Sequence, residues 1–199
     1  MAYRDFSFDK VKKSFQLQEQ NASLFSTVTP LPASAWLLET LQTSLRLARS
    51  SSSEKARSEF IIAPILVELE KRNAHNLAIF SGERLDVDEE TGLKGECDFI
   101  LAHGAMTTTL QAPIFCLVEA KKNDIKEGLG QCVAQMLGAQ LFNQQEHNNI
   151  PRMYGCVTTG EDWQFLKLEN DIIFMEETRY YINELDKLLG VLQFIIDHT

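Results

Sequence analysis

Two carboxylates and one amine lie at apolar segments of the chain, with a spacing that suits them to act together. An unbroken apolar run over residues 114–118 leads into Glu119, Ala120 and Lys121, and Asp98 lies in a shorter apolar segment upstream. Because successive side chains of a β-strand point to opposite faces, Glu119 and Lys121 project from the same face. The sequence therefore predicts an acid and an amine side by side at the end of a buried strand.

These groups could hold a divalent cation. Mg²⁺ prefers oxygen ligands and is usually held by one or two carboxylates, which Asp98 and Glu119 could supply. With Glu59, the two contribute three negative charges against the one positive charge of Lys121. Without a cation, we expect one carboxylate to have a raised pKa. The alternative is that Glu119 and Lys121 form an ordinary solvated ion pair, which would stabilise the protein little.

Apolar periodicity predicts the elements that would position these side chains. We expect strands over residues 77–80, 95–102, 114–121, 153–158, 163–168 and 172–175. We expect helices over 33–49, 54–72, 127–142 and 182–196. On an ideal helical wheel Glu59 falls on the buried stripe with Ile62 and Leu66. Pro64 should kink or divide that helix, because proline lacks the backbone N–H.

Length and composition fit one globular domain, which we divide into an N-terminal arm and helix (1–52) and a main domain (53–199). Residues 1–32 show no clear periodicity. The chain has no apolar stretch long enough for a membrane span and no apolar signal segment at its start, so we expect a soluble, cytoplasmic protein that does not bind membranes. The four cysteines are widely spaced within apolar segments, which favours buried, reduced thiols.

The formal net charge of −9 argues against binding nucleic acid through bulk electrostatics. Any contact with DNA must therefore use a local basic patch. Lys55, Arg57 and Lys122 are the candidates for such contacts, although for any one of them taken singly a solvated helix face or turn is the more common explanation.

The order of these residues resembles that of the PD-(D/E)XK nuclease superfamily. The resemblance covers residues 53–158 and is strongest to the nuclease domain of type I restriction enzyme motor subunits. It rests on the chain order Glu59, Asp98, Glu119-Ala120-Lys121, Gln131 and Gln135. The chain departs from the most familiar motif because no proline precedes Asp98.

The resemblance implies a restriction endonuclease-like fold of the mixed α/β (α+β) class. A central mixed β-sheet would be flanked by helices in the order αβββαβ, with further strands and a helix at the C-terminus. Asp98, Glu119 and the main-chain carbonyl of Ala120 would bind Mg²⁺, for which Mn²⁺ could substitute. Lys121 would contact the attacking water or the scissile phosphate, Glu59 would add a further metal contact, and Gln131 or Gln135 would steady the site.

We therefore predict a Mg²⁺-dependent nuclease that hydrolyses DNA. Phosphodiester hydrolysis builds negative charge on the phosphate and requires an activated water, and a hard cation serves both needs. The main alternative is a nuclease-like module without turnover that binds nucleic acid or protein or has a structural role. A homodimer or a partner subunit is a further possibility, through the amphipathic C-terminal helix, although its leucines more often belong to a core.

Overall fold

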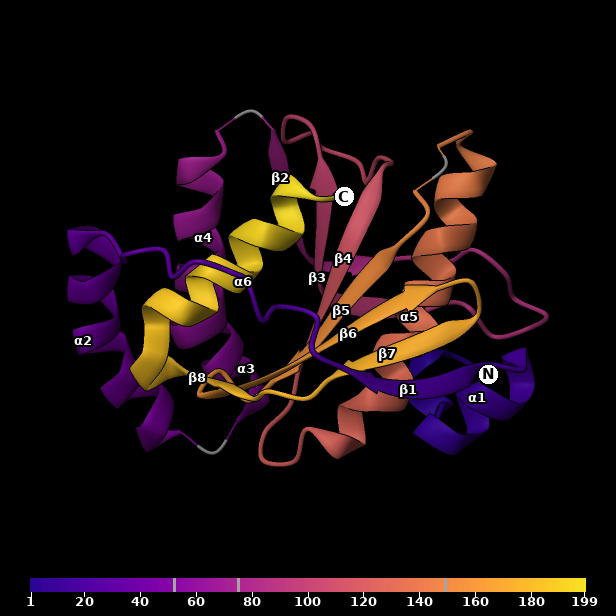
Figure 1. The fold of residues 1–199 in the computed structure, drawn as a ribbon, viewed down its shortest axis with the longest axis horizontal. Coiled ribbons are helices and arrows are strands. Elements are labelled where there is room, and N and C mark those ends of the chain that lie inside the picture. The colour runs from indigo at the N-terminus through magenta and orange to yellow at the C-terminus, as the bar shows by residue number, and fades with distance from the viewer. Residues whose placement is uncertain (52, 75, 149) are drawn as a thin grey trace.

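The computed structural model describes residues 1–51, 53–74, 76–148 and 150–199. An eight-stranded mixed sheet runs through the molecule in the order β1-β7-β6-β5-β4-β3-β2, and β8 pairs with β6 (Figure 1). Two neighbouring pairs, β1 with β7 and β4 with β5, are parallel, and the other pairs are antiparallel. The strands are β1 (Gln18–Ala22), β2 (Leu77–Arg84), β3 (Glu96–His103), β4 (Ile114–Ala120), β5 (Met153–Thr158), β6 (Asp162–Glu169), β7 (Ile172–Glu176) and β8 (Tyr180–Tyr181).

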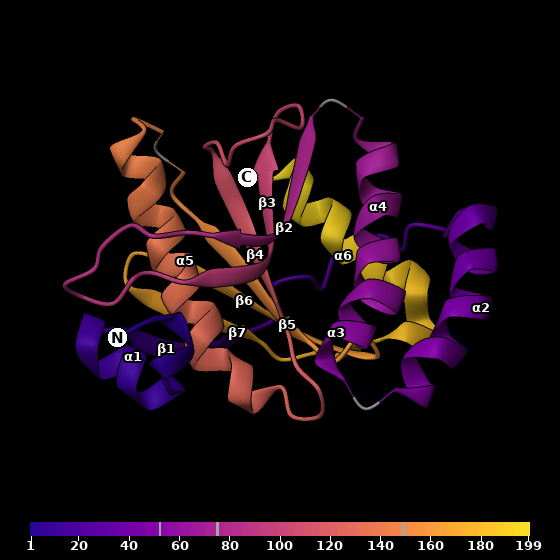
Figure 2. The ribbon, with the colours of Figure 1, turned by 180° about the vertical axis from the view of Figure 1, so that it is seen from behind.

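Helices cover both faces of the sheet, as Figures 1 and 2 show from opposite sides. One core contains apolar side chains of α2, α4 and α6, and the other contains apolar side chains of α1 and α5. The helices are α1 (Phe8–Phe15), α2 (Ala35–Ser50), α3 (Glu54–Arg57), α4 (Ala63–Arg72), α5 (Lys126–Gln145) and α6 (Leu185–Asp197), with a π-helical turn over Ser58–Ile62. The predicted mixed sheet flanked by helices is confirmed.

The N-terminal residues are packed into the same body. The sequence shows no clear periodicity over residues 1–32 and predicts no element there, but α1 and β1 form in this segment. Val11 on α1 is fully buried, and β1 adds an edge strand parallel to β7. The strand Gln18–Ala22 is polar and mostly exposed, so its conformation depends on pairing with β7 rather than on its own pattern.

The helix that follows Ser53 contains a π turn that changes which side chains are buried. The N–H of Ala63 donates to the carbonyl of Ser58, five residues earlier, and Pro64 follows at a position that needs no donor. Ala56, five residues before Ile61, is buried, whereas Glu59 leaves 54% of its side chain exposed. The prediction that Glu59 belongs to the buried stripe is therefore wrong, because the wheel assumed 3.6 residues per turn throughout.

The predicted positions of the cysteines and of the C-terminal helix are confirmed. All four cysteines are buried free thiols. Leu188, Leu189, Leu192 and Ile195 of α6 lie in the core beside the sheet, so that face of the helix is internal. Among the described residues, no helix is both long and apolar enough to cross a membrane.

Candidate functional site

The strands β3 and β4 separate at one end, and a carboxylate fills the gap. Their antiparallel pairing ends at Phe99 opposite Val118, so the next pair in register would be Asp98 and Glu119. Instead of continuing the ladder, Asp98 Oδ2 accepts a hydrogen bond of 2.7 Å from the backbone N–H of Ala120. The two carboxylates that the sequence singled out therefore lie opposite each other, where the pairing of β3 with β4 stops.

Glu119 is almost fully buried and is held by two donors. Lys121 Nζ donates to its Oε1 at 2.5 Å, and Gln135 Nε2 on α5 donates to its Oε2 at 2.8 Å. The side chain of Glu119 is 1% exposed and that of Lys121 is 14% exposed. Glu119 and Lys121 are thus a same-face pair as the alternation predicted, but the pair is buried rather than solvated.

The electrostatics of this pair agree with the expectation of a raised pKa. Burial, followed by the charge of Asp98, raises the pKa of Glu119 to about 8. Burial also raises the pKa of Asp98, although the N–H of Ala120 and the charge of Lys121 act in the opposite direction. Burial lowers the pKa of Lys121, but its carboxylate neighbours, led by Glu119, give it a net increase. The raised pKa values of both carboxyl groups mean that the surrounding donors do not fully stabilise two negative charges at this site.

The donor set fits a hard divalent cation. In an extended strand the N–H and C=O of one residue face the same neighbour, so the carbonyl of Ala120 points to the side of Asp98. Two carboxylates and one main-chain oxygen suit Mg²⁺, which usually takes few protein ligands and keeps several waters. No group of three or more His, Cys, Asp or Glu side chains is arranged to hold a metal in the described ranges. Asp98, Glu119 and Ala120 would accordingly be the protein ligands.

Helix α5 places both predicted glutamines at the site. Gln135 is fully buried against Glu119, and its Oε1 has no hydrogen-bond partner among the described residues. Gln131, one turn earlier, lines a cavity of about 600 Å³ together with Asp98, Glu119 and Lys121. Gly128 allows this close approach, because a Cβ there would lie 2.6 Å from Val157 Cγ1 and 3.0 Å from Lys121 Cγ.

A carboxylate that sequence reasoning passed over reaches the site from α3. Glu54 Oε2 lies 4.0 Å from Lys121 Nζ, and Glu54 lines the cavity beside Asp98. Glu59 lines a neighbouring hollow of about 340 Å³ that also includes Asp98, but its carboxylate pairs with Lys55 at 3.7 Å. Capping by Ser53 marked the helix start, but no local pattern in the sequence indicates that Glu54 rather than Glu59 approaches Lys121.

The three predicted DNA contacts have different surroundings. Arg57 Nη1 donates to the carbonyl of Thr159 at 3.1 Å and to Glu161 at 3.4 Å, so its guanidinium is bound by the turn between β5 and β6. Lys55 is 82% exposed beside Glu59. Lys122 is exposed next to the site. Of the three, Lys55 and Lys122 present their amines to solvent.

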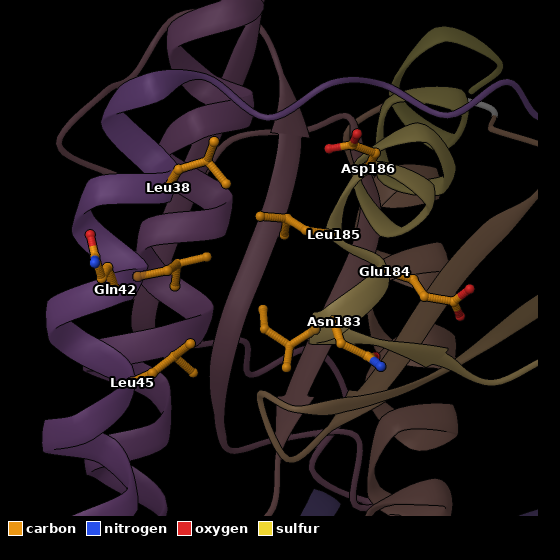
Figure 3. A pocket seen from close by; sticks show the side chains of 9 residues that line it. Leu38, Gln42, Leu45, Asn183, Glu184, Leu185 and Asp186 are labelled. Carbon is orange, nitrogen blue, oxygen red and sulfur yellow. The ribbon is translucent and has the colours of Figure 1, made fainter.

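Another hollow, of about 440 Å³, lies between α2 and the segment that leads into α6 (Figure 3). Its walls carry Leu38, Leu45 and Leu185, and its acids are engaged elsewhere. Asp186 accepts from the N–H of Ala33, and Glu184 pairs with Lys187. The hollow belongs to the side of the sheet that α2 and α6 cover, whereas Glu119 contacts α5, so it is separate from the carboxylate site.

Comparison with protein-family models, curated proteins and solved structures found no match to this chain.

Proposed function

We propose that this protein is a member of the PD-(D/E)XK superfamily and a Mg²⁺-dependent nuclease that hydrolyses phosphodiester bonds of DNA. The observation that carries the proposal is the position of Asp98 where the pairing of β3 with β4 stops, opposite Glu119 and in one cavity with Lys121. The element order supports it as well. A helix precedes three antiparallel strands, β2, β3 and β4, and α5 then connects β4 to its parallel neighbour β5.

Each side chain has a part that follows from its contacts. Asp98 and Glu119 hold the cation, and Gln135 fixes the carboxylate plane of Glu119 through its hydrogen bond. A divalent cation at these oxygens supplies the charge that activates a water and offsets the developing charge on the phosphate. The ammonium group of Lys121 adds a compact positive charge at the same place, where it can orient the water or bind a phosphate oxygen. Gln131 faces the same cavity and can bind the substrate there.

A nuclease-like module without turnover is the second candidate. It is favoured by the ion pair between Lys121 and Glu119, in which the amine is occupied by the carboxylate that would hold the cation. A cation held by Glu119 would have to compete with Lys121 for this carboxylate. If the pair persisted when Mg²⁺ was added, the fold would serve binding alone.

Nicking of supercoiled plasmid by the purified protein tests the proposal. The wild-type protein and Asp98→Asn are prepared identically and assayed with Mg²⁺ and with Mn²⁺. We expect metal-dependent nicking by the wild type and a loss of at least about 100-fold in the variant, which excludes a contaminating nuclease. Equal nicking by both proteins would contradict the assignment. Nicking by neither would favour the binding module.

A further inference from the structure

The cavity over Asp98 and Glu119 is lined by basic as well as acidic side chains. Its acids come from α3, β3 and β4. Besides Lys121, its cations are Arg4 from the N-terminal segment, Arg84 from β2, and Lys94 from the loop between β2 and β3. None of these three belongs to the set that the sequence indicated for DNA contacts. A cavity that holds cations of its own beside the proposed Mg²⁺ site suits an extended polyanion.

The N-terminal turn that carries Arg4 is firmly attached. On one side of Arg4, Tyr3 is 1% exposed and its N–H donates to the carbonyl of Lys94 at 2.9 Å. On the other side, Phe6 is 2% exposed, and its carbonyl lies 2.3 Å from where a Cβ on Gly130 would be. Gly130 is on α5, the helix that also carries Gln131 and Gln135. The backbone of Arg4 is therefore fixed relative to α5.

Arg4 differs from Arg84 and Lys94 in its ion pairing. Arg84 pairs with both carboxylate oxygens of Asp86 at 2.9 Å, and Lys94 pairs with Glu89 at 3.4 Å. The carboxylate of Asp5 accepts from the N–H of Ala2. In the described part of the chain, Arg4 makes no ion pair. Arg4 is exposed, and of these three cations it is the one that a ligand can bind without displacing a carboxylate.

We propose that Arg4 binds a backbone phosphate of the substrate strand, adjacent to the phosphate held over Asp98 and Glu119. This inference rests on the proposed nuclease function and extends it to the N-terminal turn. A guanidinium presents parallel N–H donors that match two phosphate oxygens. Lys94 and Arg84 contribute less, because a phosphate must compete with Glu89 and Asp86. The contact is made to the backbone, so it is independent of base sequence.

The test compares Arg4→Gln with Lys13→Gln, an exposed position on α1 that removes the same charge from the same segment outside the cavity. For each protein we measure nicking kinetics with Mg²⁺ at several KCl concentrations. We also measure metal-free binding of a labelled duplex oligonucleotide. For Arg4→Gln we expect KM to rise roughly tenfold with little change in kcat, and the slope of log affinity against log salt to fall by about 0.9. Arg4→Lys should recover part of the affinity, and melting temperatures should match those of the wild type.

Each outcome separates this inference from the nuclease proposal. If the wild type nicks DNA and Arg4→Gln behaves like Lys13→Gln, the phosphate site is wrong and the nuclease proposal stands. If the wild type binds but does not nick DNA, and Arg4→Gln binds more weakly with the smaller salt slope, the phosphate site stands and the nuclease proposal is wrong. Absence of both binding and nicking in the wild type overturns both.

Discussion

Replacement of Glu119 by glutamine should change how the stability of the metal-free protein depends on pH. Burial raises the pKa of Glu119 to about 8 in the folded protein, from 4.5 for an ordinary glutamate. Between these values the folded protein holds a proton that the unfolded chain has released. Stability must therefore fall as the pH rises through this window, and Glu119→Gln, which cannot ionise, should lose that dependence.

The expected magnitude follows from linkage. One extra proton in the folded state gives a slope of about −1.36 kcal/mol per pH unit. Between about pH 5.5 and about pH 7, inside the window, the wild type should lose about 2 kcal/mol relative to Glu119→Gln. The variant should fold, because Gln135 can rotate its amide so that its unpartnered Oε1 accepts from the new side-chain amide. In the wild type the pKa of Lys121 is raised, so its amine stays charged across this window.

Urea unfolding of both proteins in chelating buffer measures this difference. His103 acts in the opposite direction, because burial lowers its pKa and stability should rise as the pH increases towards its ordinary value. Both proteins contain His103, so only the difference between them reports on Glu119. We expect the free energy of unfolding of the wild type, relative to that of Glu119→Gln, to fall as the pH rises. If this relative stability were constant or rose with pH, a buried ionisable carboxylate at position 119 would be refuted.

Three further predictions concern the surroundings of the site. Gly128→Ala should lower stability by up to about 2 kcal/mol, because overpacking against Val157 and Lys121 costs about 1–3 kcal/mol and helix propensity returns about 1 kcal/mol. It should also slow nicking, and a higher urea midpoint with an unchanged rate would contradict this. Gln135→Leu removes a hydrogen-bond donor to Glu119, which should raise the pKa of Glu119 and move the pH–rate profile of nicking to higher pH. It also removes a buried oxygen without a partner, so the melting temperature should change little. An unshifted profile would count against this role of Gln135. Mg²⁺ at about 100 times its Kd should stabilise the wild type by about 2.7 kcal/mol but not Asp98→Asn; equal melting shifts in both would exclude binding at Asp98.

Most of the sheet could be predicted because its strands carry their own signals. The apolar run at residues 114–118 and the turn-flanked segments at 153–158 and 163–168 appear as β4, β5 and β6 with small changes at their ends. The strand β1 could not be predicted, since Gln18–Ala22 is polar and becomes ordered through its partner β7. The helix α1 has an apolar face, but its eight residues are too few to distinguish from a loop by pattern alone.

Some residues of the site could be predicted from local sequence patterns, and others are brought to it by contacts between distant segments. Strand alternation was enough to place Glu119 and Lys121 on one face, and helical spacing to place Gln131 and Gln135 on one helix. Glu54 reaches the site by approaching Lys121, 67 residues further along the chain, and Arg4 lines the cavity through packing of Tyr3 and Phe6 against distant segments. No local pattern reports such contacts, because they are made between residues far apart in the chain.

Single-turnover nicking by Lys121→Ala and by Lys122→Ala tests the central claim most directly. The two lysines are neighbours in sequence and carry the same charge, but Lys121 contacts Glu119 inside the site and Lys122 is exposed. With Mg²⁺ and saturating DNA, we expect the rate to fall at least about 100-fold for Lys121→Ala and less than about threefold for Lys122→Ala. Equal rates for the two variants would contradict the assignment of Asp98, Glu119 and Lys121 as the active site of a nuclease.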